Sequence, residues 1–171
     1  MRLTGANDVD RGTRVRSTSN VLLRDVAEGD LPAFFEHQRD PDANHMAAFP
    51  PRDKDAFMVH WTKVLGDQTA IKKTILFDGA VAGNVVSWLQ HERREVGYWI
   101  AKELWGKGIA TTALSQFLVH VTARPLHAHV AKHNAASIRV LEKCGFQITG
   151  EDKCPSPAGG EVVEEFIMRL Q

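Results

Sequence analysis

The stretch EVGYWIAKELWGKGIATTAL, residues 95–114, decides the fold of this chain. It predicts a strand, a short turn with two glycines, and the first turns of a helix. A helix start carries backbone N–H groups without intrahelical partners and a partial positive charge, so it attracts anions. Gly106 and Gly108 let the backbone bend sharply and let a phosphate come close to it, and Lys107 adds a positive charge. The stretch therefore predicts a site for a phosphorylated ligand.

The spacing of these glycines differs from that of two common phosphate-binding loops. A nucleoside-triphosphate loop needs four residues between its glycines and then Lys-Ser or Lys-Thr, whereas Lys107 alone separates Gly106 from Gly108. A dinucleotide fingerprint needs a third small residue where this chain has Thr111, and it normally opens its domain. Taken alone, such a turn is also typical of an ordinary loop. The ligand therefore depends on what the rest of the sequence contains.

A second motif, NAASIRVLEKCGF at residues 134–146, predicts a short helix that starts at Asn134 and stops at Gly145. Asn is a favourable N-cap and Gly a favourable residue after a helix end, so local structure explains each residue taken singly. Two such motifs in this order favour a functional interpretation.

Together the two motifs resemble the GNAT superfamily of acetyl-CoA-dependent N-acetyltransferases. The resemblance is to the branch that contains the bacterial ribosomal-protein N-terminal acetyltransferases, and it runs from about Asn20 to the C-terminus. In this family the first motif binds the CoA pyrophosphate through Gln or Arg, two residues, Gly, one residue, then Gly or Ala. This chain has Trp105 at the first of these positions, so no polar side-chain contact is implied there.

The resemblance implies a GNAT fold of the α+β (mixed α/β) class. Such a fold has a mixed, mostly antiparallel sheet of six to seven strands with a splayed parallel pair, flanked by about four helices. We expect a single domain over residues 20–171 after a disordered tail over 1–19, and a loop over 40–52. The predicted strands are 21–24, 70–77, 80–90, 93–101, 126–131, 146–152 and 161–170. The predicted helices are 30–38, one that starts at Asp53 or Asp55 and runs to 65, 107–121 and 134–143.

Composition restricts the partners and the compartment. The 171 residues carry 21 basic and 21 acidic side chains, which predicts no broad nucleic-acid or membrane surface. No apolar run reaches membrane-spanning length, and the N-terminus lacks the apolar segment of a secretory signal. Cys144 and Cys154 provide no disulfide framework, which fits the cytoplasm. We expect a cytoplasmic monomer or homodimer.

The resemblance also implies the residues that bind acetyl-CoA. Its pantetheine arm would lie between strands 95–101 and 126–131, with a backbone N–H near Ile100 polarising the thioester carbonyl. The expected cofactor-binding residues are Tyr98, Trp99, Ile100, Trp105, Gly106, Lys107, Gly108, Ile109, Ala110, Thr111, Asn134 and Lys143.

Glu95 is the candidate general base, acting directly or through a water, because it lies on the strand that lines the gap. The alternative is an exposed carboxylate paired with Arg93 or Arg94. Many relatives carry a Tyr acid where this chain has Leu141, so Ser137 is the candidate acid, with Asn134 holding the pantetheine or a water. An ordinary early-helix serine, with solvent as the acid, is the alternative.

Three histidines, His127, His129 and His133, resemble a metal cluster, but no carboxylate or thiol is suitably spaced near them, so we predict no metal site. A position for one of these histidines beside the pocket that binds the amine fits the sequence better.

Residues 40–61 are expected to form the acceptor pocket. The function predicted is direct acetyl transfer to a primary amine: a protein N-terminus, a polyamine or aminoglycoside, or an amino acid. The alternative is a non-catalytic acetyl-CoA-binding sensor or regulatory module.

Overall fold

The computed structural model describes residues 20–155 and 162–171, so the predicted tail at 1–19 lies outside the described residues. The seven strands are β1 (Val21–Asp25), β2 (Ile71–Phe77), β3 (Ala80–Gln90), β4 (Arg93–Ile100), β5 (Leu126–Ala131), β6 (Gln147–Pro155) and β7 (Val162–Leu170). The helices are α1 (Leu31–Gln38), α2 (Pro41–Ala47), α3 (Lys54–Gly66), α4 (Ile109–His120) and α5 (Ala135–Lys143), with short 3₁₀ turns at Glu28–Asp30 and Lys102–Leu104. None of these helices is long and apolar enough to span a membrane.

All seven strands form one sheet in the order β1-β2-β3-β4-β5-β7-β6. Its neighbours pair antiparallel except β4 and β5, which are parallel. The parallel pairing is confined to Arg94 with Leu126 and Glu95 with His127. Beyond these two pairs the strands separate, and the predicted mixed sheet with a splayed parallel pair is confirmed.

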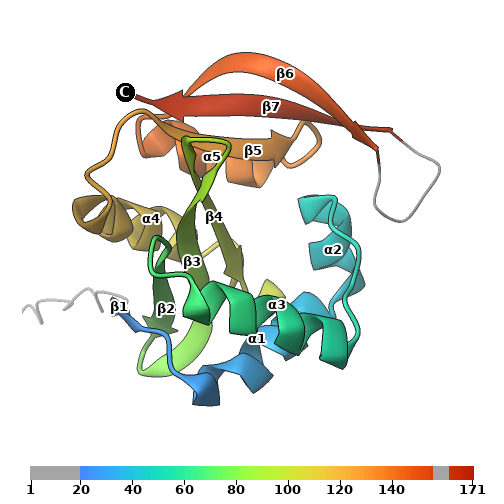
Figure 1. Cartoon of the computed structure of the whole chain (residues 1–171), viewed down its shortest axis with the longest axis vertical. Helices are drawn as coiled ribbons and strands as arrows, with labels where there is room; N and C mark the ends of the chain where they lie inside the picture. Colours follow the sequence, from blue (N-terminus) through green and yellow to red (C-terminus); the bar gives the residue numbers. More distant parts are fainter. Residues whose placement is uncertain (1–19, 156–161) are drawn as a thin grey trace, which may run out of the picture.

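The sheet is covered by helices on both faces, over two separate apolar cores. On one face, Leu114 and Phe117 of α4 and Leu141 of α5 pack on the central strands. On the other face, Phe34 of α1 packs with Phe57 and Trp61 of α3. Figure 1 shows α1, α2 and α3 grouped together, away from α4 and α5. Each large side chain buried in these cores contributes roughly 1.5–3 kcal/mol.

The predicted loop at residues 40–52 is wrong in its first half, because α2 occupies it. The side chain of Asp40 accepts a hydrogen bond from the N–H of Ala43 at 2.9 Å, and Pro41 takes the first helical position. Asp and Pro are loop formers in a sequence pattern, but the same pair also starts helices. The helix ends at Ala48, whose φ of 51° is left-handed.

A buried carboxylate joins the start of α1 to the first two strands. Asp30 is 4% exposed and accepts both guanidinium N–H groups of Arg24 at 2.6 Å, the hydroxyl of Thr74 at 2.7 Å and the N–H of Ala27 at 2.9 Å. The Arg24 hydrogen bonds, supported by those from Ala27 and Thr74, lower the pKa of Asp30 to about 2. This carboxylate therefore fixes α1 against the sheet as an anion.

Candidate active site

Because β4 and β5 separate, a backbone N–H of β4 faces the gap between the two strands. The N–H of Ala101 donates to the carbonyl of Ala82 on β3 at 2.9 Å. Successive N–H groups alternate sides along a strand, so the N–H of Ile100 points the other way, toward β5. The carbonyl of Ile100 accepts from the indole Nε1 of Trp105 at 3.0 Å. This geometry agrees with the expected carbonyl-polarising donor near Ile100.

The turn before α4 leaves the amides at the start of that helix free for an anion. Gly106 and Gly108 both have φ of 76°, a left-handed conformation that glycine adopts without steric cost. Gly108 is the N-cap, so no side chain accepts from the first amides, and the first turn contains no acidic residue. The helix N-terminus therefore keeps the properties of an anion site.

A cavity of ≈ 370 Å³ connects this helix start to the gap between the strands. Most of the residues predicted to bind the cofactor line it: Tyr98, Trp99, Ile100, Trp105, Gly106, Gly108, Ile109, Ala110, Thr111, Asn134 and Lys143. Ser137 lines it too, whereas Lys107 does not. The Nζ atom of Lys107 lies 5.7 Å from the ring centre of Phe77 instead. We call this space the donor cavity.

The candidate acid, Ser137, is paired with the chain's one tyrosine. The hydroxyl of Tyr98 lies 2.7 Å from the Oγ atom of Ser137 inside the donor cavity. Burial raises the pKa of Tyr98 to about 12, against the opposing effect of the Ser137 hydrogen bond. Tyr98 therefore stays protonated at neutral pH, and the two hydroxyls form a hydrogen-bonded pair that the sequence did not reveal.

Asn134 has structural hydrogen bonds at both ends of its carboxamide. Its Oδ1 atom accepts from the N–H of Ser137 at 3.1 Å, and its Nδ2 atom donates to the carbonyl of Met46 at 3.0 Å. These bonds cap α5 and attach it to α2. If Asn134 also holds the pantetheine or a water, as predicted, it must do so while making both of these hydrogen bonds.

The candidate base, Glu95, lies on the face of the sheet covered by α1 and α3. It is 6% exposed, it is absent from the lining of both cavities, and its Oε1 atom lies 3.9 Å from Nε2 of His129. The Nδ1 atom of His129 is 3.5 Å from Oε2 of Glu165. Glu165, with Glu95 as the weaker partner, raises the pKa of His129 against the effect of burial. Neither Glu95 nor His129 is among the described residues that line the two cavities, so a role for Glu95 as the base requires a proton to reach it through His129 or a water.

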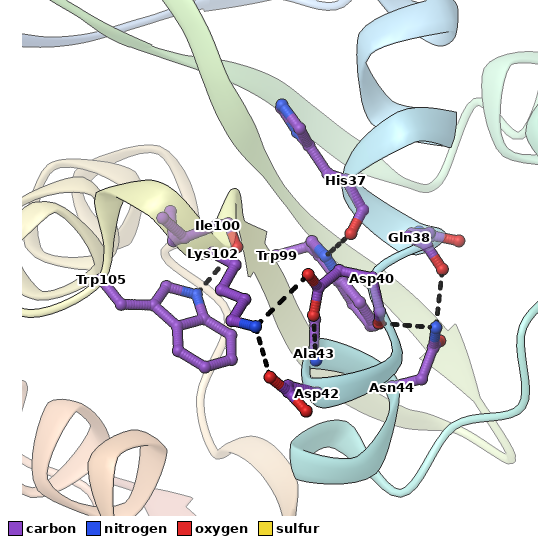
Figure 2. A network of polar contacts seen from close by, with 10 residues as sticks. All are labelled: His37, Gln38, Asp40, Asp42, Ala43, Asn44, Trp99, Ile100, Lys102 and Trp105. Atoms are coloured by element: carbon purple, nitrogen blue, oxygen red, sulfur yellow. Dashed lines mark hydrogen bonds and ion pairs between the residues drawn. The ribbon is translucent and has the colours of Figure 1, made fainter.

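A network of polar contacts fixes the end of β4 against α1 and α2 (Figure 2). The indole Nε1 of Trp99 donates to the carbonyl of His37 at 3.1 Å. Lys102 pairs with Asp42 and lies 3.6 Å from Asp40. The acids Asp40 and Asp42 are therefore engaged within the protein, which agrees with a structural role for them rather than amine recognition.

A second cavity of ≈ 470 Å³ lies on the α3 side of β4. Its floor consists of side chains that point to one face because they are paired across β3 and β4: Asn84 with Trp99, Val86 with Gly97, and Trp88 beside them. A Cβ added at Gly97 would lie 3.3 Å from the ring of Trp88, so the absence of a side chain at Gly97 leaves room for that ring. We call this space the acceptor cavity. The two cavities share Tyr98 and Trp99.

The acceptor cavity is lined by polar side chains whose buried atoms lack partners among the described residues. These atoms are Nε1 of Trp61, Nδ2 of Asn84 and Oε1 of Gln38. An unmet buried donor or acceptor costs about 1–3 kcal/mol. Such atoms are normally satisfied in folded proteins, so these three polar groups are open to a ligand or to water.

Sequence reasoning missed several residues of these cavities. Arg139 lines the donor cavity with Lys143, four residues apart on α5, and that helical spacing was available as a signal. Arg52 and His60 of the acceptor cavity lie within the expected segment 40–61, although no motif marks them, and Lys63 of α3 lies just beyond it. Within the segment 40–61 expected to form the acceptor pocket, Phe49 lines the acceptor cavity but Phe57 is fully buried in the core.

The three histidines at positions 127, 129 and 133 have different surroundings. Across residues 20–155 and 162–171, no three His, Cys, Asp or Glu side chains are grouped to hold a metal ion. His133 stacks on His45 at 5.0 Å between ring centres, and His127 is buried. His129 is the histidine that lies beside the candidate base.

Comparison with known proteins identifies the family of this fold and site. Residues 20–147 match the family described as acetyltransferase (GNAT) domain. The "Putative ribosomal N-acetyltransferase YdaF" of Bacillus subtilis is 30% identical over 105 residues, 57% of this chain and 57% of that protein. The chain thus matches little more than half the length of that relative.

Two further relatives align over most of their length. The L-amino acid N-acetyltransferase AaaT of Escherichia coli is 22% identical over 160 residues, 88% of this chain and 97% of that protein. The spermidine N-acetyltransferase from Vibrio cholerae, solved in complex with CoA and spermine, superposes with a TM-score of 0.76 at 21% identity, over 88% of this chain and 94% of that one. Likeness at this identity shows a shared fold.

Proposed function

The chain belongs to the acetyltransferase (GNAT) family, and from this premise we propose that it transfers the acetyl group of acetyl-CoA to a primary amine. One observation carries the proposal: a glycine-capped helix start opens into a cavity that reaches Ile100, beyond the two residue pairs at which β4 and β5 are joined. The free amides of α4 suit a pyrophosphate, and the N–H of Ile100 suits a thioester carbonyl. The family relative from Vibrio cholerae was solved with CoA.

The residues of the donor cavity fit acetyl-CoA as a substrate. Gly106 and Gly108 remove side chains where phosphates would approach the turn. Arg139 and Lys143 add two cations at the same cavity, which suits a molecule carrying several phosphates. Three or four amides on a pyrophosphate, each hydrogen bond worth roughly 1.5–3 kcal/mol before losses, support micromolar binding.

The reaction proposed is a direct attack without a covalent enzyme intermediate. The amine nitrogen forms a bond to the acetyl carbon, the carbon–sulfur bond breaks, and CoA leaves as a thiol. The proton lost by the amine passes to Glu95 through His129 or a water. The proton gained by the thiolate comes from Ser137, whose hydroxyl is hydrogen-bonded to the protonated Tyr98.

The acceptor class within this function is a separate proposal. The resemblance to the ribosomal-protein branch favours peptide N-termini, and the relatives also include enzymes named for spermidine and for L-amino acids. A cytoplasmic monomer or homodimer acting on a small amine or on a peptide is consistent with these relatives.

The test is CoA-thiol release from acetyl-CoA across short peptides, polyamines, aminoglycosides and free amino acids. Turnover with at least one class supports an N-acetyltransferase. Calorimetric titration with acetyl-CoA is run in parallel. Protein that binds acetyl-CoA but releases no thiol with any amine would instead be a binding module. Protein that does not bind acetyl-CoA would overturn the assignment of the donor cavity as well.

A further inference from the structure

We propose that the acceptor cavity binds a carboxylate, so the amine substrate is an amino acid or a closely related amino carboxylate. This inference rests on the proposed acetyl transfer and names its acceptor. Three observations carry it: a group of basic side chains around the cavity, a scarcity of carboxylates on its walls, and its junction with the donor cavity.

Three basic side chains lie close together at the acceptor cavity. The pKa of His60 is lowered by burial and further by the charges of Arg52 and Lys63, so both cations lie near it. Arg52 is half-buried, and burial lowers its pKa also. Its guanidinium lies 4.4 Å from the ring centre of Phe49, which fixes it in the cavity wall. Grouping cations in this way costs energy unless an anion joins them.

Arg52 has no counter-ion within the described part of the chain. No carboxylate of residues 20–155 or 162–171 lies within 4.0 Å of its guanidinium nitrogens. A guanidinium presents parallel donors that match the two oxygens of a carboxylate. An unpaired, half-buried Arg in a cavity is therefore suited to a carboxylate ligand.

The walls of the cavity argue against a polycationic amine. Asp67 is the single acidic residue among the described residues that line it, and its Oδ1 atom already accepts from the N–H and the hydroxyl of Thr69 at 2.8 and 2.7 Å. A polyamine or an aminoglycoside would place several positive charges beside Arg52 and Lys63. Such like-charge contacts are unfavourable, whereas a single carboxylate is favourable.

The junction of the two cavities gives the amine a direction. Trp99 and Tyr98 line both cavities, so a ligand held at Arg52 can extend its amine toward the donor cavity. Trp61, Trp88 and Trp99 provide apolar walls between these ends. Asn84, paired with Trp99 across the strands, adds a neutral amide at the floor. An amine at one end and a carboxylate at the other fit this arrangement.

The experiment compares amines that differ only in the carboxylate. Thiol release is measured with L-phenylalanine, L-phenylalaninamide and phenethylamine, then with the corresponding leucine series and with a Phe-Gly-Gly peptide. We expect the free amino acid of each series to have a kcat/KM at least tenfold above that of its amide or decarboxylated amine. Equal values, or preference for the amide, the amine or the peptide, would overturn the proposal.

A variant series assigns the preference to Arg52. We expect Arg52→Gln to lower the ratio of kcat/KM for amino acid over amide at least tenfold, and Arg52→Lys to lower it less. Lys54→Gln removes an exposed cation two residues further along the chain, in the first turn of α3, and should leave the ratio unchanged. An unchanged ratio in Arg52→Gln, in protein with a normal melting temperature, would remove Arg52 from carboxylate recognition.

A binding measurement separates this inference from the proposed function. Three tryptophans line the acceptor cavity, so quenching of their fluorescence by L-phenylalanine can be followed without acetyl-CoA. Quenching by the amino acid but not by the amide supports the carboxylate site even if no acetyl transfer is found. Turnover of amines irrespective of a carboxylate would keep the acetyltransferase and overturn the carboxylate site.

Discussion

The two cavities on either side of β4 are built by different means. The donor cavity depends on backbone: the amides at the start of α4, the N–H of Ile100 and two glycines with left-handed φ. The acceptor cavity depends on side chains brought from α1, α3, β3 and β4 and from the segment between α2 and α3. Backbone groups are the same in every residue, so a donor site of this kind serves one ligand across many sequences. Side chains differ at every position, so the acceptor site is where this chain acquires its own specificity.

The largest effect is expected from Gly108→Val, which tests the backbone character of the donor cavity. A β-branched residue at φ of 76° is strained, so the turn must rearrange and the helix-start amides lose their direction. No atom lies within 4 Å of an added Cβ, so the fold should survive. We expect acetyl-CoA affinity to fall about 100-fold, as for the loss of two hydrogen bonds to a charged group, in a calorimetric titration.

Gly79→Val is the matched control for that change. Gly79 lies in the turn between β2 and β3, has φ of 84° and also has open space around an added Cβ. Gly79→Val therefore introduces the same backbone strain as Gly108→Val, at a position outside the linings of both cavities. Equal weakening of acetyl-CoA binding in the two variants would show that the effect is general instability.

The next effect is expected from Glu95→Gln, which tests whether a proton path leads from the amine to this carboxylate. Loss of a general base lowers the rate about 100-fold. The affinity for acetyl-CoA should not change, because Glu95 is absent from the lining of the donor cavity. Steady-state kcat and calorimetry measure the two quantities.

Glu165→Gln is the control for Glu95, since Glu165 is the other carboxylate beside His129. Losing Glu165 should lower the pKa of His129 and shift the pH–rate profile with a much smaller loss of kcat. Similar losses in both variants would mean that these acids act solely by holding the charge of His129.

Asp30→Asn should weaken the acceptor side of the sheet without touching the donor cavity. The pKa of Asp30 is about 2 in the folded protein against 3.8 for the free group, so its contribution is present above pH ~4 and is lost as pH falls through about 2. That difference corresponds to about 2 kcal/mol of unfolding free energy. Urea unfolding at pH 7 should show this loss for the variant, and the difference from wild type should narrow near pH 2.

Glu36→Gln is the comparison for Asp30, because it breaks an exposed pair with Arg39 on the same helix. Its effect on stability should be much smaller. Asp30→Asn should also leave acetyl-CoA affinity unchanged in the folded protein. A loss of affinity would show that the two sides of the sheet are energetically coupled.

The smallest effect is expected from Ser137→Ala. A thiolate is a good leaving group, so its protonation contributes less than deprotonation of the amine, and we expect kcat to fall about tenfold. Tyr98→Phe removes the hydroxyl 2.7 Å from Ser137 and should fall in the same range. A rate within twofold of wild type for Ser137→Ala would remove that hydroxyl from the mechanism and leave solvent as the acid.

Much of the fold followed from local sequence signals. The turn at 78–79 between the predicted strands 70–77 and 80–90, the start of α1 after Asp30 and the start of α3 after Asp53, one of its two predicted starts, agree with the structure, because caps and turns depend on neighbours in sequence. The α2 helix was missed because Asp40 and Pro41 fit both a loop and a helix start. The choice between them was made by tertiary contacts: Asn44 donates to the carbonyl of Gln38 at 2.8 Å, and Met46 accepts from Asn134.

The sequence by itself determined the family and the donor cavity, because a turn, its glycines and the following helix are adjacent along the chain. Tertiary structure alone decided that Tyr98 meets Ser137, that His129 lies between Glu95 and Glu165, and that Arg52 reaches the cavity floored by Asn84. These residues belong to elements far apart in sequence, and no local periodicity records which of them will meet. Their meeting is set by strand register and by how α3 packs on the sheet, which are properties of the whole fold.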